Sequence, residues 1–237
     1  MSSSIKIVII PAAGIGSRMN ADIPKQYIKL KNQKTILDTA ISIFVNSDFF
    51  DKVIVTLNKN DDYWQGSIYS NNPKVITCIG GDTRFESVRN GLAAIKQFDS
   101  TNDGWVFVHD AARPAVGLAD IMRLYEQVDA TAAQCGILAV RAFETVKKVS
   151  GNAITETLDR NDIWLAQTPQ LAKCSQLSKA FEYCQDNHLI DRITDEASAL
   201  ELFGSSPIIV EGSRKNIKVT AAEDLDFIDW VFANKLD

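Results

Sequence analysis

Short apolar runs alternate along this chain with longer segments whose apolar residues recur every three or four positions. A short apolar run between turn residues indicates a strand buried on both faces, whereas the longer period indicates a helix with one apolar side. Strands are predicted over residues 5–11, 52–57, 75–79, 105–108, 136–140, 207–210 and 216–219. Helices are predicted over residues 35–45, 83–98, 118–131, 172–187, 195–203 and 221–233. This alternation predicts an α/β fold with a doubly wound, mostly parallel, Rossmann-like sheet.

One segment departs from this alternation. Residues 144–149 and 153–158 have the pattern of two short strands around the turn Ser150-Gly151-Asn152, which is a hairpin signal. An isolated hairpin is only marginally stable in water, so this one is expected to pack against something else. We therefore expect a protruding β-hairpin arm at about residues 142–160, serving either as a lid or edge hairpin or as a dimerisation arm.

The composition is that of an ordinary soluble protein, with 46% hydrophobic and 23% charged residues. A chain of 237 residues fits one domain, residues 1–237, with the arm as an appendage. The net charge of −5 disfavours nonspecific binding of a nucleic-acid backbone. A phosphorylated small substrate stays compatible with this charge, because a few local Arg and Lys residues suffice to hold it.

Several features bear on the compartment. No apolar run approaches the roughly 20 residues that a membrane-spanning helix needs, and the first residues lack the pattern of a secretory signal. The four cysteines form no CxxC pair and have apolar neighbours, which is typical of buried free thiols in a reducing compartment. We expect a cytoplasmic protein without a membrane partner. The histidines, His109 and His188, are too few and too dispersed for a typical zinc site.

The loop after the first predicted strand carries the most information. It reads Pro11-Ala12-Ala13-Gly14-Ile15-Gly16-Ser17-Arg18-Met19, followed by Pro24-Lys25-Gln26-Tyr27. Small residues directly after a buried strand let backbone N–H groups approach a ligand closely, and Arg18 and Lys25 add positive charge. A dinucleotide fingerprint needs a glycine where Arg18 stands, and the Gly-Lys-Ser/Thr of a Walker A loop is absent. The combination suits a nucleoside triphosphate.

Two further loops follow predicted strands. Gly80-Gly81-Asp82 opens a predicted helix, and from the residues alone it is either an ordinary turn with Asp82 near the helix N-cap or part of a binding site. Asp110 follows the fourth predicted strand, either as a cap or as a ligand of a ribose or of Mg²⁺. Because ligands bind at the carboxyl ends of strands in such sheets, these loops and the glycine loop are expected to meet.

Motifs throughout the chain resemble one family. They are the glycine loop with its PKQY segment; Gly80-Gly81-Asp82-Thr83-Arg84 with Ser87-Val88; Val108-His109-Asp110-Ala111-Ala112-Arg113-Pro114; Thr157-Leu158-Asp159-Arg160-Asn161; Gln167-Thr168-Pro169-Gln170; Thr194 to Glu201; and Val210-Glu211-Gly212 with Asn216-Ile217-Lys218-Val219-Thr220. In this order they resemble the 2-C-methyl-D-erythritol 4-phosphate cytidylyltransferase family, which has a nucleotidyltransferase fold. The resemblance implies transfer of a cytidylyl group from CTP to 2-C-methyl-D-erythritol 4-phosphate with release of pyrophosphate, in the non-mevalonate isoprenoid pathway. It also implies Mg²⁺ as cofactor and a homodimer formed through the arm.

The resemblance also implies roles for individual residues. The cytosine pocket and the rest of the nucleotide site are expected to involve Ala12, Ala13, Gly14, Gly16, Gly81, Asp82, Ser87, Asp110 and Ala111. The catalytic cations are expected to be Arg18, Lys25, Arg160 and Lys218, where Arg18 and Lys25 neutralise the triphosphate and the other two dock the attacking phosphate. The acceptor is expected to contact Arg113, Thr145 and Thr194, with Arg160 reaching in from the partner's arm and Thr168 as a further candidate. Asp110 is the expected metal ligand.

The segment before the arm departs from the family pattern, because Arg141 stands where a proline is common and Glu144 replaces an aspartate. Four alternatives compete with the family's activity. They are a ribitol-5-phosphate cytidylyltransferase, a nucleotidyltransferase for a sugar phosphate, a catalytically inactive nucleotide-binding protein and a dinucleotide-dependent reductase. Ala12-Ala13-Gly14 and Asp110-Ala111-Ala112-Arg113-Pro114 favour the methylerythritol enzyme over the ribitol enzyme, and the presence of Arg18, Lys25 and Asp110 disfavours an inactive protein.

Overall fold

The computed structural model describes residues 4–14, 23–99 and 103–234. Within them, seven strands form one sheet in the order β3-β2-β1-β4-β8-β5-β9. The strands are β1 (Lys6–Pro11), β2 (Lys52–Leu57), β3 (Val75–Ile79), β4 (Trp105–Val108), β5 (Cys135–Arg141), β8 (Trp164–Lys173) and β9 (Ile208–Glu211). All neighbours pair in parallel except β8, which runs antiparallel to β4 and β5. The mostly parallel sheet predicted from the sequence is confirmed.

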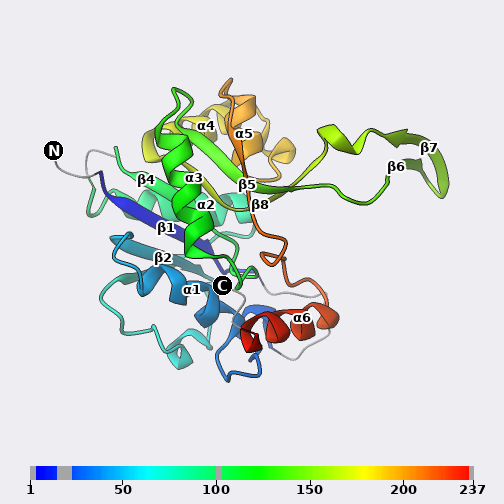
Figure 1. Cartoon of the computed structure of the whole chain (residues 1–237). Coiled ribbons are helices and arrows are strands. Elements are labelled where there is room, and N and C mark those ends of the chain that lie inside the picture. Colours follow the sequence, from blue (N-terminus) through cyan, green and yellow to red (C-terminus); the bar gives the residue numbers. More distant parts are fainter. Residues whose placement is uncertain (1–3, 15–22, 100–102, 235–237) are drawn as a thin grey trace.

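Helices cover both faces of the sheet (Figure 1). Helices α1 (Ile36–Val45) and α3 (Leu118–Asp129) pack on one face, and α2 (Arg84–Ile95), α4 (Cys174–Asp186) and α5 (Glu196–Leu202) pack on the other. Helix α6 (Ala222–Ala233) lies beside this body and packs through Ile228 against Leu30 and Val219. Single turns of 3₁₀ helix occupy Lys25–Tyr27, Trp64–Gly66, Arg160–Asp162 and Ile190–Arg192. The doubly wound arrangement follows from this distribution.

The core is divided by the sheet into two layers. Alternate residues of β1 face opposite layers, so that Val8 and Ile10 join α1 and α3 whereas Ile7 and Ile9 join α2 and α4. A strand covered on both faces has to be apolar at every position, which explains the continuous apolar run from which β1 was predicted. The sheet therefore holds the carboxyl ends of its parallel strands on a rigid base.

Side-chain caps fix where several helices begin. The hydroxyl of Thr83 accepts a hydrogen bond from the N–H of Glu86, and the Glu86 carboxylate accepts one from the N–H of Thr83. Asp195 and Ser198 form the corresponding pair at the start of α5. Each cap satisfies backbone donors that the first helical turn leaves free. The starts of α2 and α5 are thereby fixed next to the loops that precede them.

The predicted hairpin projects from the body as an arm (Figure 1). Its strands β6 (Val146–Ser150) and β7 (Ala153–Leu158) pair with each other in a separate two-stranded sheet. Gly151 takes a positive φ of 57° in the turn, a conformation that favours glycine. The arm exposes apolar side chains, Val149 and Ile154 among them, which leaves an apolar surface without a covering partner in the single chain.

One strand of the sheet was not predicted, and one predicted strand is wrong. Strand β8 was not predicted, and the helix expected from residue 172 begins at Cys174 after β8 ends. Residues 216–219, expected as a strand, form no ladder; Val219 donates a single backbone hydrogen bond to Ala112, and Asn216 is held through its side chain. The alternating apolar residues Ile217 and Val219 of this segment pack against α6 instead.

The cysteines are free, as expected, and none is exposed. Cys135, Cys174 and Cys184 are buried and Cys78 is half-buried. Burial raises the pKa of the Cys135 thiol to about 11 and that of Cys174 to about 12. Among the described helices, none combines the length and apolar character needed to cross a bilayer.

Candidate active site

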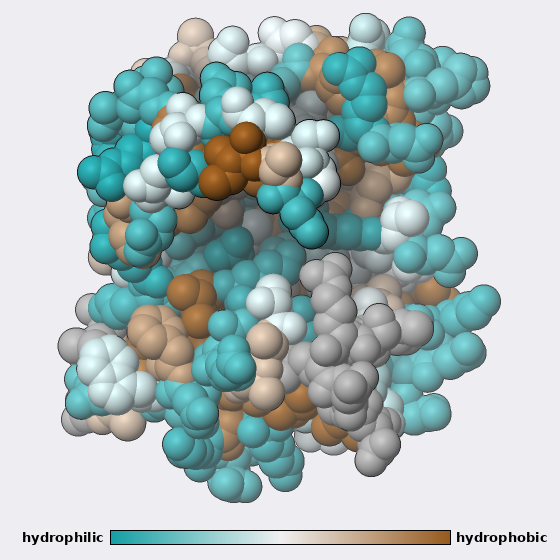
Figure 2. Space-filling view, turned by 90° about the vertical axis from the view of Figure 1, so that its right-hand side faces the viewer, coloured by the Kyte–Doolittle hydropathy of each residue, from teal (hydrophilic) through white to brown (hydrophobic). Residues whose placement is uncertain are grey.

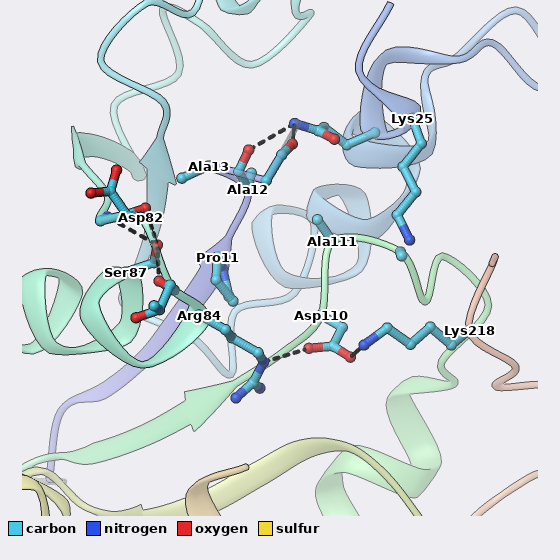
Figure 3. Close-up of a pocket in the computed structure, with 15 residues that line it drawn as sticks. Pro11, Ala12, Ala13, Lys25, Asp82, Arg84, Ser87, Asp110, Ala111 and Lys218 are labelled. Carbon is cyan, nitrogen blue, oxygen red and sulfur yellow. Dashed lines mark hydrogen bonds and ion pairs between the residues drawn. The ribbon is translucent and has the colours of Figure 1, made fainter. Parts of the chain in front are cut away.

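Three loops meet at the carboxyl ends of parallel strands, as the sequence predicts. The loops after β1, β3 and β4 surround a pocket that also receives Lys25 and Lys218 (Figure 3). Figure 2, which faces the side on which the arm projects, shows a hollow across the molecule whose walls are mostly hydrophilic. Ten of the predicted site residues line the pocket: Ala12, Ala13, Gly14, Lys25, Gly81, Asp82, Ser87, Asp110, Ala111 and Lys218. Gly16 and Arg18 lie outside the described residues.

The described part of the glycine loop is held by side-chain amides. Nε2 of Gln26 donates to the carbonyl oxygens of Ala12 and Gly14, at 2.8 and 2.9 Å. Nδ2 of Asn58 donates to the carbonyl of Ala13, at 3.1 Å. These bonds fix three consecutive carbonyls and so orient the peptide planes of the loop. Sequence reasoning did not assign a role to Gln26 or Asn58, although Gln26 belongs to the PKQY segment.

The loop after β3 approaches the glycine loop closely. A Cβ atom at Gly80 would lie 2.6 Å from the Cβ of Ala13 and 2.9 Å from Oγ of Ser87, so only glycine fits. Oγ of Ser87 accepts a hydrogen bond from the N–H of Gly81 at 3.1 Å and donates one to the carbonyl of Thr83 at 3.0 Å. The result is a narrow slot lined by backbone groups and one hydroxyl, a surface that matches the polar edge of a planar base.

Asp110 is the charged centre of the pocket. Its Oδ1 accepts a hydrogen bond from Nε of Arg84 at 3.1 Å, and its Oδ2 lies 2.7 Å from the Lys218 ammonium (Figure 3). Burial alone would raise the pKa of Asp110, but Arg84 and Lys218 together hold it well below its ordinary value. Asp110 is therefore a carboxylate at every physiological pH.

The backbone around Asp110 is fixed by a series of buried hydrogen bonds through Thr168 and His109. The N–H of Asp110 donates to Oγ1 of Thr168 at 3.0 Å, and Nδ1 of His109 lies 3.0 Å from the same oxygen. Nε2 of His109 lies 2.9 Å from the carbonyl of Arg113, which only accepts, so the ring proton is on Nε2 and the Thr168 hydroxyl donates to Nδ1. Burial lowers the pKa of His109 to about 4, so the ring is neutral at physiological pH.

Lys25, which lines the pocket, and Arg113, which lies beside Asp110, are tied to the same segments. Nζ of Lys25 donates to the carbonyl of Val219 at 2.9 Å, next to Lys218. The Arg113 guanidinium donates to the carbonyls of Asn216 and Ala166, at 2.6 and 3.2 Å, and its Nε lies 3.8 Å from Oδ2 of Asp110. Burial lowers the pKa of Arg113. The segment around residues 216–219 thus carries Lys218 into the pocket and helps to hold Lys25 and Arg113.

Five residues expected at the acceptor do not line the pocket: Arg113, Thr145, Arg160, Thr168 and Thr194. Thr145 and Thr194 are exposed, at the base of the arm and just before α5. Arg160 lies in the 3₁₀ turn after β7, where its guanidinium donates to the carbonyl of Phe143. Thr168 lies next to the pocket but uses its hydroxyl to hold Asp110 and His109.

Sequence reasoning missed Arg84 and Glu196. Arg84 lines the pocket, and besides Asp110 it contacts the buried Glu196 through two hydrogen bonds of 2.7 and 2.9 Å. The signals in the sequence were that Arg84 ends the motif that begins at Gly80 and that Glu196 lies in the motif from Thr194 to Glu201.

A divalent cation would find few protein ligands here. Within the part of the chain that the structure describes, no three His, Cys, Asp or Glu residues gather as a metal site, and the carboxylates lining the pocket are Asp82 and Asp110. One carboxylate with water and phosphate oxygens is the donor set that Mg²⁺ takes up at nucleotide sites. Asp110 therefore fits a metal that arrives with a nucleotide.

Comparisons with known proteins find relatives along almost the whole chain. The chain matches the model of the family described as 2-C-methyl-D-erythritol 4-phosphate cytidylyltransferase over residues 6–233. Proteins of that name from Pseudomonas putida and Haemophilus ducreyi are each 39% identical to it, over 96% and 98% of this chain and 95% and 97% of theirs. The crystal structure of the Francisella tularensis protein of that name is 53% identical, with a TM-score of 0.85, and the match covers 96% of this chain and 99% of that chain. Because the family model matches residues 6–233 and these relatives align with almost the whole chain, the chain belongs to the 2-C-methyl-D-erythritol 4-phosphate cytidylyltransferase family.

Proposed function

We propose that this chain transfers the cytidylyl group of CTP to 2-C-methyl-D-erythritol 4-phosphate, giving 4-diphosphocytidyl-2-C-methyl-D-erythritol and pyrophosphate in the non-mevalonate isoprenoid pathway. Family membership supports the reaction. The single observation that carries it to this chain is the pocket in which the glycine loop, the Ser87 slot and the Lys25, Lys218 and Asp110 charges face one another.

The cytosine ring is proposed to enter the slot between the glycine loop and Gly81. Cytosine presents an amino donor and two acceptors, which backbone carbonyls, N–H groups and a hydroxyl can match. Uracil presents a different pattern and would leave groups of the slot unpaired, at a cost of about 1–3 kcal/mol each. Asp82 and Ser87 flank this slot, and the ribose is proposed to lie near Ala111 and Asp110.

The acceptor phosphate is itself the nucleophile, so no strong base is needed. One of its oxygens attacks the α-phosphorus of CTP in line, a new P–O bond forms, and the bond to the leaving pyrophosphate breaks with its electron pair. Positioning and charge stabilisation then dominate catalysis. Lys25 and Arg18 are proposed to neutralise the triphosphate oxygens, and Lys218 and Arg160 to dock the attacking phosphate. Lys25 and Lys218 enter the pocket from neighbouring segments, which supports their acting on the two reactants together.

Mg²⁺ is proposed as the cofactor, bound by Asp110 together with phosphate oxygens of the nucleotide. When bound it would offset the repulsion between the two anionic reactants. The chain's own contribution is to keep Asp110 ionised and its backbone fixed through Thr168.

A homodimer is proposed to complete the acceptor site. Thr145 and Arg160 lie at the arm, outside the pocket of their own chain, so a second copy whose arm reaches across would supply Arg160 to it. Arg113 and Thr194 are proposed to contact the same acceptor. The exposed apolar residues of the arm support an interface there. We place the protein in the cytoplasm, where its free thiols stay reduced.

Purified protein incubated with CTP, a divalent cation and one acceptor at a time tests the reaction, with pyrophosphate release and product mass as readouts. Release with 2-C-methyl-D-erythritol 4-phosphate, and at least tenfold less with ribitol 5-phosphate or with UTP in place of CTP, is the expected result. Release with ribitol 5-phosphate alone would overturn the acceptor. No release with any acceptor, together with retained CTP binding, would instead support a nucleotide-binding protein without activity.

A further inference from the structure

Arg84 joins two parts of the molecule that are far apart in sequence. It is the first residue of α2, directly after the Gly81 loop, and its side chain is 29% exposed at the pocket. Its guanidinium donates through Nη1 and Nη2 to both oxygens of Glu196 and through Nε to Oδ1 of Asp110. The planar fork of arginine matches such a bidentate contact, and lysine cannot reproduce it.

Glu196 is fixed on its own side. It is the first residue of α5, its side chain is 3% exposed, and Arg84 binds both of its carboxylate oxygens. Gln170 of β8 holds the start of α5, because its Oε1 accepts from the N–H of Ala197 and its Nε2 donates to Asp195, both at 2.8 Å. The guanidinium is therefore anchored to the sheet through α5.

The two oxygens of Asp110 are divided between different partners. Arg84 takes Oδ1, whereas Oδ2 faces Lys218 and, at 3.8 Å, Arg113. Burial alone would lower the pKa of Arg84, but Glu196 and Asp110 raise it above its ordinary value. The guanidinium is always charged, and Glu196 holds its Nη1 and Nη2. Its Nε therefore fixes the rotation of the Asp110 carboxylate about the Cβ–Cγ bond. A buried ion pair contributes little net stability compared with apolar packing, so a positional role is a better account of it.

We propose that Arg84, clamped by Glu196, is a positioning residue that orients the Asp110 carboxylate and links the nucleotide loop after β3 to the α5 end of the site. This inference rests on the proposed cytidylyl transfer, in which Asp110 holds the nucleotide. The Glu196 contact holds Arg84 on Oδ1, so that Oδ2 is left to the pocket side, where it pairs with Lys218.

We call the contact of Arg84 with Glu196 and Asp110 the clamp. The substitutions Arg84→Lys and Glu196→Gln test it. Each roughly keeps the size of the side chain but removes the bidentate contact. Each is expected to lower kcat/KM for CTP about 10- to 100-fold, up to the loss that a misplacement of about 1 Å can cause. Glu196→Asp keeps the carboxylate and is expected to retain more activity than Glu196→Gln. Arg89→Lys is the matched control, because Arg89 lies on the same helix and contacts Gln185 on the surface, at 2.7 Å.

A double-mutant cycle with Asp110→Asn separates positioning from a general structural effect. If Arg84 acts through Asp110, Arg84→Lys lowers kcat/KM by less than threefold in the Asp110→Asn background. The full 10- to 100-fold loss in that background would overturn the proposal, as would a change of less than twofold for Arg84→Lys in the wild type.

The affinity for CTP, measured by calorimetry on the same variants, keeps the test independent of turnover. A wild-type protein that binds CTP but makes no product would contradict the proposed function and leave the clamp testable by affinity. Wild-type affinity and wild-type turnover in Arg84→Lys would contradict the clamp and leave the proposed function intact. If Glu196→Gln fails to fold, Arg84→Lys and its cycle decide the question alone.

Discussion

The buried histidine next to Asp110 makes the stability of the fold depend on pH in a defined window. His109 is fully buried and neutral, and its pKa is lowered from 6.5 to about 4 by burial. One pKa unit corresponds to about 1.4 kcal/mol at 25 °C. The difference between 6.5 and about 4 therefore corresponds to about 3 kcal/mol in the free energy of unfolding.

The sign follows from which state binds the proton. Between pH 6.5 and 4 the unfolded chain protonates its histidine while the folded chain resists protonation, so acidification favours unfolding. The contribution of His109 is fully present above pH 6.5 and is lost as the pH falls toward 4. The ionised carboxylate of Asp110, whose pKa is lowered, loses its contribution only at more acidic pH.

The perturbation is His109→Gln, which removes the titrating group but keeps a donor for the Arg113 carbonyl. Urea unfolding of both proteins at intervals between pH 8 and 4 gives the free energy of unfolding of each. The variant is expected to be less stable at pH 8, because a flexible amide replaces a ring that is fully buried. The difference in the free energy of unfolding between the two proteins is expected to shrink by about 3 kcal/mol by pH 4. Neighbouring charges such as Asp110 and Arg113 are common to both proteins and cancel in the difference.

The control is His188→Asn, at an exposed turn with a positive φ of 56° that asparagine tolerates. A gap between wild type and His109→Gln that stays constant from pH 8 to 4 would refute the reasoning. So would a change of the same size for His188→Asn, because it would show that burial of His109 is not the cause.

Three further outcomes are expected. Lys25→Ala should lower kcat by about 10²–10³, the scale for a lost electrostatic group, with an unchanged circular dichroism spectrum; near-wild-type turnover would contradict its role. Ser87→Ala should raise KM for CTP about 10-fold or more and lower the ratio of CTP to UTP use in competition assays, because the N–H of Gly81 loses its hydrogen-bond acceptor. An unchanged ratio would count against the slot. Gly136→Ala should destabilise the fold by about 1–3 kcal/mol in urea unfolding, since its Cβ would lie 2.8 Å from the backbone oxygen of Ile208; an unchanged midpoint would contradict the close approach of β5 and β9.

Most strands and helices could be predicted because each is covered by apolar partners and shows this in its own residues. The strand β8 could not, because its middle carries Gln167, Thr168 and Gln170, which are polar and yet buried. Each of these side chains is satisfied by a partner distant in sequence, namely Ser213, Asp110 and the start of α5. A local pattern marks such residues as a loop, since the partners that allow their burial are known only from the fold.

The pocket, too, could be predicted from the sequence only where its features are local. The glycine loop, the Ser87 loop and Asp110 could be located because each follows a recognisable strand and the ends of parallel strands share one edge. The pairing of Arg84 with Glu196 spans 112 positions, and nothing local to either residue predicts it. Residues 216–219 have the alternation of a strand but form no ladder. Their apolar residues pack against α6, and Lys218 enters the pocket.

The burial of the native thiols has a practical consequence for measuring the arm. The thiolate is the form that reacts with maleimides and similar labels. Burial raises the pKa of all four native thiols, including the half-buried Cys78, and so keeps them protonated at neutral pH. A cysteine introduced at the exposed hairpin tip, for example by Asn152→Cys, should react first. The arm could then carry one fluorophore or spin label per chain without removal of any native cysteine, and the separation between two labels would report on how two copies meet.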